Sequence, residues 1–207
     1  MGLAISVGLL YDQARNDMEG FEHHQRTFAR LSQALADKGI TWHEPEITDP
    51  PGTHRFSGGF SYEHLAHLRR AFALNKTGGA VTPATTTSEE QYKRDLQVVQ
   101  GQTSIFYSHL LLHAGVDGYY IPAEFPDPAI RAGHSVGSSQ RLLTELTSFA
   151  SAIGISLDEE GRLPEEEAAR LAAMPTSDPY EPEKLAWYQL HQACLASLIS
   201  GHAVVFH

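Results

Sequence analysis

Histidine is the residue type in this chain whose number and spacing could support metal chemistry. The sequence contains 12 histidines in 207 residues, and His109 and His113 lie four residues apart within a helix predicted over residues 89–113. Side chains at positions i and i+4 of a helix lie on the same face, and at this spacing two imidazoles can bind one metal ion. The pair is therefore the first candidate for a mononuclear metal site.

Two further histidines, His24 and His191, fall on the apolar faces of helices predicted over residues 19–38 and 183–200. Buried imidazoles are costly unless their nitrogens find partners, and one bound ion would satisfy several at once. Nitrogen and oxygen ligands without sulfur favour a divalent ion such as Zn, Fe, Mn, Ni or Cu. The competing interpretation is that each histidine is a hydrogen-bonded core residue. The carboxylates that could complete the ligand set or act as a base are Glu19, Glu22 and Glu63.

A stretch rich in glycine and serine, before a helix predicted to begin at residue 138 or 139 and end near residue 153, could bind an anionic substrate. Free backbone amides at the start of a helix attract anions. Ordinary helix capping and core packing are the competing interpretations. No GK[ST] motif is present, so no nucleotide cofactor is expected. The residues predicted for this site are Ser138, Ser139 and Arg141, with Tyr119 and Tyr120 beside them.

The stretch Gly133-His134-Ser135-Val136-Gly137 matches the G-x-S-x-G pattern of a nucleophile elbow. That motif requires an apolar strand directly before it, and residues 126–132 contain two prolines and read as a loop. A serine hydrolase that uses Ser135 is therefore a minor alternative.

The elements that would position these residues predict an α+β fold. Helices outnumber strands, and the strands do not alternate regularly with helices, so a doubly wound sheet is not expected. We expect a predominantly helical single domain over residues 1–207. Its small sheet would contain the N-terminal strand, the central strand at 118–122 and the C-terminal strand. The predicted strands are 2–11, 118–122 and 203–206, the helices are 19–38, 61–75, 89–113, 138–153, 164–173 and 183–200, and the longer loops include 46–60 and 76–88.

Charge and cysteine content exclude several classes of function. The chain has 15 Lys and Arg against 25 Asp and Glu, a formal net charge of −10, which is the wrong sign for binding nucleic acid. Its one cysteine, Cys194, excludes an internal disulfide and a thiolate zinc cluster. No stretch is long and apolar enough to cross a membrane, and the N-terminus does not resemble a signal peptide. These features predict a cytoplasmic protein.

Several stretches together resemble a family of uncharacterised bacterial proteins. The resemblance covers most of the chain and implies a bacterial, cytoplasmic origin, but it carries no activity, cofactor or catalytic residue with it. The stretches that carry it are Met1-Gly2-Leu3, Glu44-Pro45-Glu46, Ser108-His109-Leu110, Gly118-Tyr119-Tyr120-Ile121-Pro122, and Gly133 with Gly137-Ser138-Ser139-Gln140-Arg141-Leu142-Leu143.

Two functions of different classes follow from these observations. The first is an enzyme that acts on a small molecule through one histidine-ligated metal ion, which would polarise the substrate or activate a water. The alternative is a non-catalytic acidic interaction module, such as an immunity or regulatory protein, that binds a basic partner by electrostatic complementarity. The first predicts metal in the purified protein, whereas the second does not.

Overall fold

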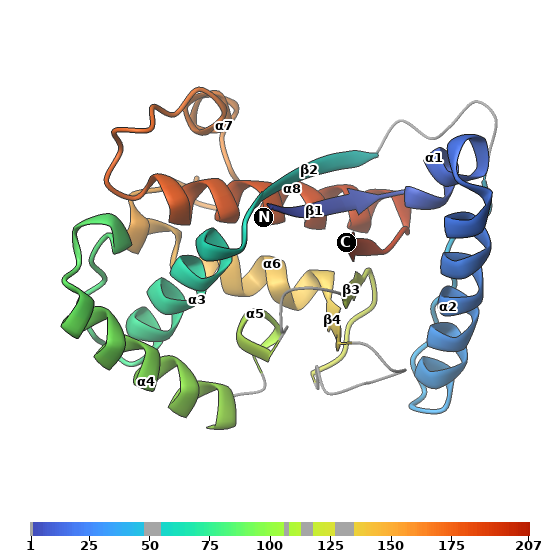
Figure 1. The fold of residues 1–207 in the computed structure, drawn as a ribbon, viewed down its shortest axis with the longest axis horizontal. Coiled ribbons are helices and arrows are strands. Elements are labelled where there is room, and N and C mark those ends of the chain that lie inside the picture. Colours follow the sequence, from blue (N-terminus) through green and yellow to red (C-terminus); the bar gives the residue numbers. More distant parts are fainter. Residues whose placement is uncertain (1, 48–54, 106–107, 113–117, 127–134) are drawn as a thin grey trace.

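A computed structural model describes residues 2–47, 55–105, 108–112, 118–126 and 135–207 (Figure 1). These residues form an α+β fold in which helices pack around one five-stranded sheet with strand order β2-β1-β5-β3-β4. Strand β1 is antiparallel to β2 and β5, and β3 is antiparallel to β5 but parallel to β4. The strands are β1 (Gly2–Val7), β2 (Phe56–Ser61), β3 (Gly118–Ile121), β4 (Ser135–Ser138) and β5 (Val204–Phe206).

The predicted sheet of N-terminal, central and C-terminal strands is confirmed, but β2 and β4 form where loops or a helix start were expected. Both contain glycines, which usually weaken a strand. Here the glycines allow close packing. A Cβ at Gly59 would lie 2.5 Å from the backbone oxygen of Leu3, and one at Gly137 would lie 2.4 Å from the ring of Tyr120.

The helices largely follow the predicted ranges, but a helix at residues 9–16 was not predicted. The predicted strand 2–11 ends at Val7, and α1 follows it. The predicted helix 89–113 is interrupted, because α4 ends at Ile105 and a separate α5 begins at His109. The helices are α1 (Leu9–Asn16), α2 (Met18–Ala36), α3 (Tyr62–Lys76), α4 (Glu89–Ile105), α5 (His109–Leu112), α6 (Ser139–Ser148), α7 (Glu165–Ala172) and α8 (Glu181–Ser200), with 3₁₀ turns at η1 (Ala84–Thr86) and η2 (Ala150–Ile153).

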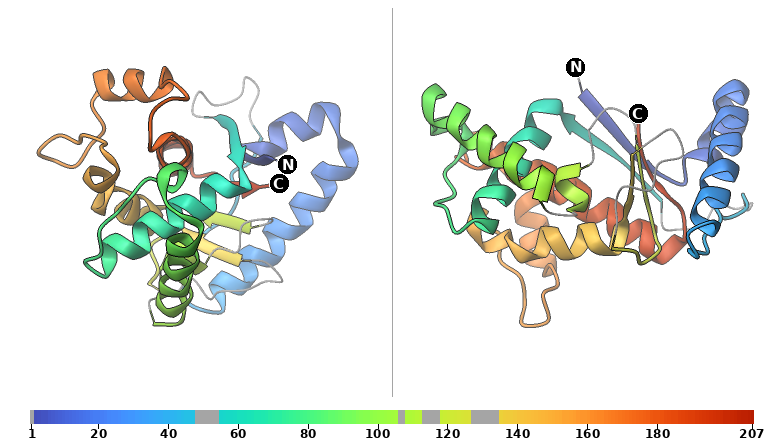
Figure 2. Two further views of the ribbon diagram at one scale, coloured as in Figure 1. Left: turned by 60° about the vertical axis from the view of Figure 1, so that its left-hand side comes forward. Right: turned by 90° about the horizontal axis from the view of Figure 1, so that it is seen from below.

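Alternation along the strands divides the core into two parts. Val204 and Phe206 of β5 face the larger part, to which α3, α6 and α8 contribute side chains. Val205 faces the smaller part, to which α1 and α2 contribute. Tyr120 and Tyr119 of β3 separate in the same way. Figure 2 shows α1 and α2 on one side of the sheet and the remaining helices on the other. No helix among the described residues is long and apolar enough to span a membrane.

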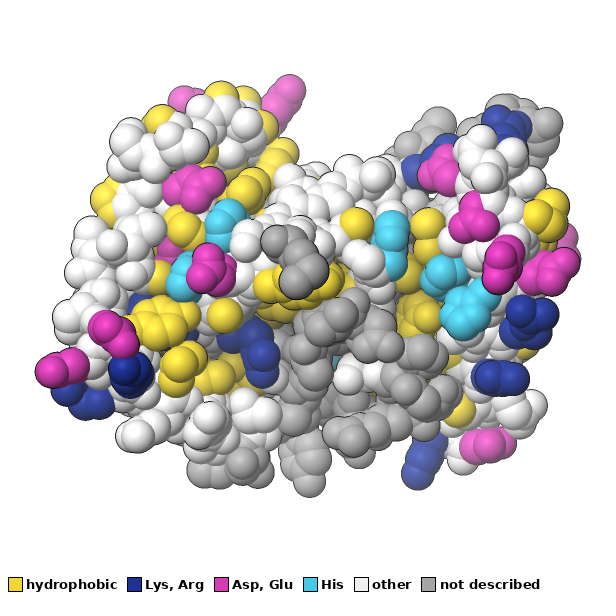
Figure 3. Space-filling view, in the orientation of Figure 1, with side chains coloured by type: hydrophobic (Ala, Val, Ile, Leu, Met, Phe, Trp, Pro, Cys, Tyr) yellow, Lys and Arg dark blue, Asp and Glu magenta, His cyan; other side chains and the backbone are white. Residues whose placement is uncertain are grey.

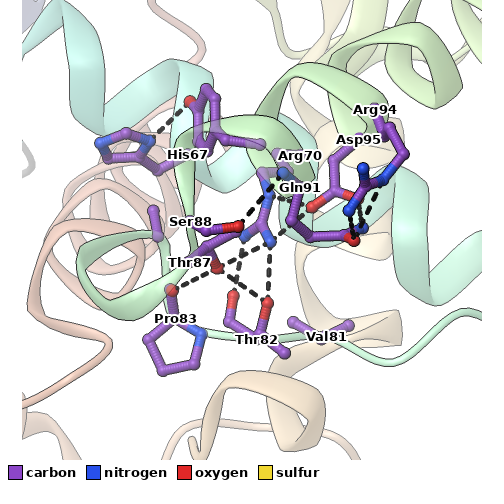
Figure 4. A network of polar contacts seen from close by, with 12 residues as sticks. His67, Arg70, Val81, Thr82, Pro83, Thr87, Ser88, Gln91, Arg94 and Asp95 are labelled. Atoms are coloured by element: carbon purple, nitrogen blue, oxygen red, sulfur yellow. Dashed lines mark hydrogen bonds and ion pairs between the residues drawn. The ribbon is translucent and has the colours of Figure 1, made fainter.

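A buried ion pair joins α3 and α4 to the loop before η1 (Figure 4). The Arg70 side chain is fully buried, and its Nε donates to Asp95 Oδ2 at 2.7 Å. The same guanidinium donates to the carbonyl of Thr82 at 2.7 Å and to the hydroxyl of Thr87 at 3.1 Å. Gln91 Nε2 donates to the other Asp95 oxygen at 2.7 Å. We call these five residues the Arg70 network.

Candidate functional site

Two of the described candidate metal ligands, His109 and His24, form hydrogen bonds with backbone groups through Nδ1. His109 is 2% exposed, and its Nδ1 accepts the backbone N–H of Ser138 at 2.9 Å. His24 lies on α2, where its Nδ1 bonds the carbonyl of Gly20, one turn earlier, at 3.0 Å. His113 lies outside the described residues.

His191 is packed in the larger core. It is 3% exposed and stacks on Trp187 of the same helix, with ring centroids 4.6 Å apart and planes 16° apart. Burial lowers its pKa to about 4, so the imidazole is neutral at physiological pH. His24 packs instead against Phe28, which belongs to the smaller core. Among the described residues, no group of three His, Cys, Asp or Glu side chains is placed to hold a metal ion.

The predicted anion-binding residues form a helix cap in the structure. Ser138 is the N-cap of α6, and its Oγ accepts the backbone N–H of Arg141 at 3.2 Å. Ser139 is fully buried and its hydroxyl bonds that of Ser197 at 2.9 Å. The Arg141 side chain forms an ion pair with Glu124. These contacts follow the capping interpretation, and anion binding there stays a prediction.

The two predicted lining tyrosines are core residues. Tyr119 is 4% exposed and Tyr120 is 1% exposed, on opposite sides of the sheet. The Tyr120 hydroxyl donates to the carbonyl of His109 at 2.8 Å, and burial raises the pKa of this phenol well above its ordinary value. Ser135 is the first residue of β4 rather than the residue at a turn between strand and helix, so the geometry of a nucleophile elbow is not present.

Glu145 explains why α5 begins at His109. Its carboxylate accepts the backbone N–H groups of His109 and Leu110 at 3.0 and 2.8 Å, and the hydroxyl of Ser108 at 3.0 Å. Burial raises the pKa of Glu145, while these three donors oppose that shift. Sequence periodicity missed this arrangement because the capping group comes from α6, more than thirty residues away.

A different surface stands out by its charge. Residues 155–183, which we call the acidic segment, contain nine Asp or Glu and two Arg, a balance of −7 within a chain of net charge −10. The segment includes α7, which projects from one end of the molecule (Figure 1). Figure 3 shows carboxylates over α7.

The first arginine of the acidic segment is held by its own loop. Arg162 Nε donates to Asp158 Oδ2 at 2.9 Å, and Arg162 Nη2 donates to Glu160 at 2.8 Å. The other Asp158 oxygen accepts the backbone amides of Glu160 and Arg162 at 3.0 and 2.8 Å. The bond from the Arg162 amide is the largest influence that lowers the pKa of Asp158.

Two further cations, Arg170 and Lys184, are also held by acids of the segment. Arg170 donates two bonds of 2.6 Å to Glu167, and these bonds lower the pKa of that carboxyl. Lys184 Nζ donates to Asp178 at 2.6 Å. Burial would raise the pKa of Asp178, but the bonds from Lys184 and the Tyr180 amide outweigh it, and the pKa is lowered.

Three carboxylates of the acidic segment are left facing solvent. Glu159, Glu165 and Glu166 are exposed, and none forms an ion pair or hydrogen bond with the side chains that the structure describes. Because nearby cations are already bound to other acids, these three can accept donors from another molecule. The acidic residues in the first turn of α7 are favourable for the helix dipole. A charge balance calculated segment by segment is the sequence signal that points to this surface.

The α1–α2 region is charged in a different way. Asp12 pairs with Arg55, and Glu22 lies 3.7 Å from Arg26 on the next turn. Figure 3 shows acidic and basic side chains interspersed over these two helices. The region therefore presents both signs of charge.

Comparisons with known proteins bear on which of the predicted functions is correct. A family model described as "Putative DNA-mimic protein" matches residues 1–206. No curated protein and no solved structure matches the chain. The family contradicts the prediction of a histidine-ligated metal enzyme, and it favours the alternative of a non-catalytic acidic module. With the family match and no metal-binding group among the described residues, the prediction of a metal-binding enzyme is wrong. The predicted set of four histidine ligands is itself not tested, because His113 lies outside the described residues.

Proposed function

We propose, from the premise that the chain belongs to the "Putative DNA-mimic protein" family, that it is a non-catalytic module that binds the DNA-binding surface of a basic protein. While bound, it would keep DNA from that surface. In this proposal, the chain acts as one globular domain in a bacterial cytoplasm, the origin that the sequence resemblance implies.

The observation that carries the proposal is the unpaired negative charge of the acidic segment. Duplex DNA presents one negative charge per roughly 1.7 Å of helix axis, and proteins bind it largely through Lys and Arg contacts to phosphate oxygens. The carboxylates of Glu159, Glu165 and Glu166 can accept the same charged donors. Their own neighbouring cations, Arg162 and Arg170, are already bound within the segment.

The net charge supports the same function over longer distances. A chain of net charge −10 attracts a basic surface and steers the encounter, an effect that weakens as salt concentration rises. It also repels DNA itself. Because the protein and DNA would use the same basic residues of the partner, only one of them can bind there at a time.

A competition experiment tests the proposal. The immobilised full chain is used to capture proteins from a bacterial lysate, and bound proteins are eluted with a 30-base-pair duplex. Each eluted protein is purified and bound to a fluorescent duplex. We expect the chain to displace that duplex at physiological salt. A captured protein whose complex with DNA persists in a large excess of the chain would contradict the proposal.

Matched variants locate the effect on the acidic segment. The variant Glu159→Gln/Glu165→Gln/Glu166→Gln should displace the duplex about tenfold less well, because exposed ion pairs contribute roughly 0.2–1 kcal/mol each. The control Glu19→Gln/Glu22→Gln/Asp37→Asn removes the same charge from α2 and the residue that follows it, and should lose much less. Equal losses in the two variants would show that net charge alone is responsible.

A further inference from the structure

Helix α2 lies at the end of the molecule opposite α7 (Figures 1 and 2), and an apolar groove lies beside it. It encloses about 480 Å³ between α2 and residues 43–47, within the roughly 300–1,000 Å³ typical of ligand pockets. We call it the α2 groove. Its apolar lining consists of Leu10, Phe21, Phe28, Ala29, Pro45 and Ile47.

Contacts with the end of α8 hold the wall of the groove in place. The carboxylate of Glu44 accepts His202 Nδ1 at 2.7 Å and the backbone N–H of Ala203 at 2.8 Å. Just before it, Trp42 Nε1 donates to the carbonyl of Gly201 at 3.0 Å. These bonds tie the 43–47 wall to the turn before β5, so the groove is formed before any partner arrives.

The floor of the groove is packed against the smaller core, and its exposed lining includes one large apolar side chain. Phe28 is 3% exposed and packs edge-on against Trp42 and Tyr119, with ring centroids 6.0 and 5.7 Å away. At the mouth, Ile47 is 40% exposed. An apolar side chain entering the groove would therefore meet a fixed surface and lose its own contact with water.

The charged side chains in the lining of the groove select the kind of segment that can enter. Glu44 and Glu46 lie in the lining, which contains no Lys or Arg among the described residues. Glu46 is exposed and forms no ion pair with them. An apolar floor with acidic side chains beside it is complementary to an apolar residue flanked by cations.

We infer that the α2 groove receives an apolar side chain from a basic segment of the partner protein. This inference rests on the proposed function, because many proteins that bend DNA insert an apolar wedge between base steps while basic residues contact the phosphates. The α2 groove offers such a wedge an apolar slot with carboxylates in place of phosphates. Because it lies far from α7, it is a second contact that can be removed independently of the acidic segment.

Two synthetic peptides of equal charge, GKRLFRKG and GKRSSRKG, test the inference. Their binding to the full chain is measured by fluorescence anisotropy at physiological ionic strength. We expect the peptide containing Leu and Phe to bind at least tenfold more tightly, since burying one large apolar side chain is worth about that factor. Equal affinities would overturn the inference.

Variants assign the preference to the groove. Ala29→Trp, which would fill the groove, and Ile47→Asp at its mouth should each abolish the preference. The matched control Ile199→Asp changes an apolar residue that is 60% exposed outside the groove, and it should preserve the preference. Circular dichroism and a melting curve of each variant verify folding. A dimer of the wild-type chain that Ile47→Asp dissociates would instead identify a second copy as the occupant and overturn the inference.

The outcomes separate this inference from the proposed function. The variant Glu159→Gln/Glu165→Gln/Glu166→Gln should keep its preference for the apolar peptide while it loses displacement of duplex DNA. If the wild-type chain displaces DNA but binds both peptides equally, the groove inference fails and the proposed function stands. If the peptides differ but DNA is never displaced, the proposed function fails, and with it the assignment of the groove to a DNA-binding partner.

Discussion

In the Arg70 network, a carboxylate that is almost fully buried lies against a guanidinium that is fully buried, whereas in the acidic segment three carboxylates face solvent without a described ionic partner. Asp95 is 3% exposed and bonds both Arg70 and Gln91. Glu159 and Glu166 are exposed and have no ionic partner among the described residues, because the arginines beside them bind other acids. The same chemical group therefore holds helices together in one region and is left available in the other.

This difference shows that the net charge of the chain is not a uniform property of its surface. Removing one partner of a buried pair leaves an uncompensated charge in the interior, which is strongly destabilising. Removing an exposed carboxylate changes little in the folded structure, because water solvates it in both states. The two regions should consequently separate stability from binding.

The largest expected effect comes from breaking the Arg70 network. Asp95→Ala should lower the free energy of unfolding by about 3–5 kcal/mol, because it leaves the Arg70 guanidinium buried with its charge unpaired. Urea denaturation followed by circular dichroism measures this change. Asp95→Asn, which keeps the shape and an acceptor oxygen, should cost less. A loss below about 1 kcal/mol for Asp95→Ala would mean that the buried pair does not stabilise the fold.

Lowering the pH should reduce the stability of the folded protein through the buried His191. Burial lowers the pKa of His191 to about 4, below the value of about 6.5 for an unfolded histidine. Between these values the unfolded chain binds a proton that the folded chain does not. The contribution of His191 to the free energy of unfolding is therefore complete above pH 6.5. As the pH falls toward 4, about 3 kcal/mol of that contribution is lost.

The pH effect is measured as the difference between wild type and His191→Leu. This difference is needed because burial raises the pKa of Glu145 and Glu183, which opposes the histidine contribution as the pH falls. Urea denaturation at several pH values between 7 and 4 should show a steeper loss of stability in the wild type. Parallel curves for the two proteins would contradict the assignment to His191.

The smallest expected effect lies in the acidic segment. Glu159→Gln/Glu165→Gln/Glu166→Gln should change the free energy of unfolding by less than about 1 kcal/mol, because exposed substitutions rarely do more. Part of that change would come from the loss of negative charge at the start of α7. Thermal melting curves of this triple variant, of Asp95→Ala and of the wild type measure the difference. A loss as large as that of Asp95→Ala would show that these carboxylates serve the fold rather than binding.

The sequence predicted much of the secondary structure but not the site. Apolar periodicity and capping residues located α2, α3, α7 and α8 within one or two residues at each end. Composition also gave the acidic interaction module as an alternative, which the family supports. The preference for a metal enzyme came from assuming that inward histidines on separate helices meet. His24 packs near Phe28 in the smaller core, whereas His191 stacks on Trp187 in the larger.

By itself, the sequence determined the α+β class, most of the helices and the excess of negative charge, because each depends on residue types and on neighbours a few positions apart. Only the tertiary structure decided which carboxylates are available. Glu165 and Glu167 look alike in the sequence, yet one is exposed and the other is 9% exposed and bound to Arg170 and the Ser156 amide. Likewise, fully buried Glu183 accepts the N–H of Ala84, 99 residues away. Folding decides which carboxylates gain hydrogen-bond donors and which stay exposed. Those donors come from distant parts of the chain, so the local sequence does not predict them.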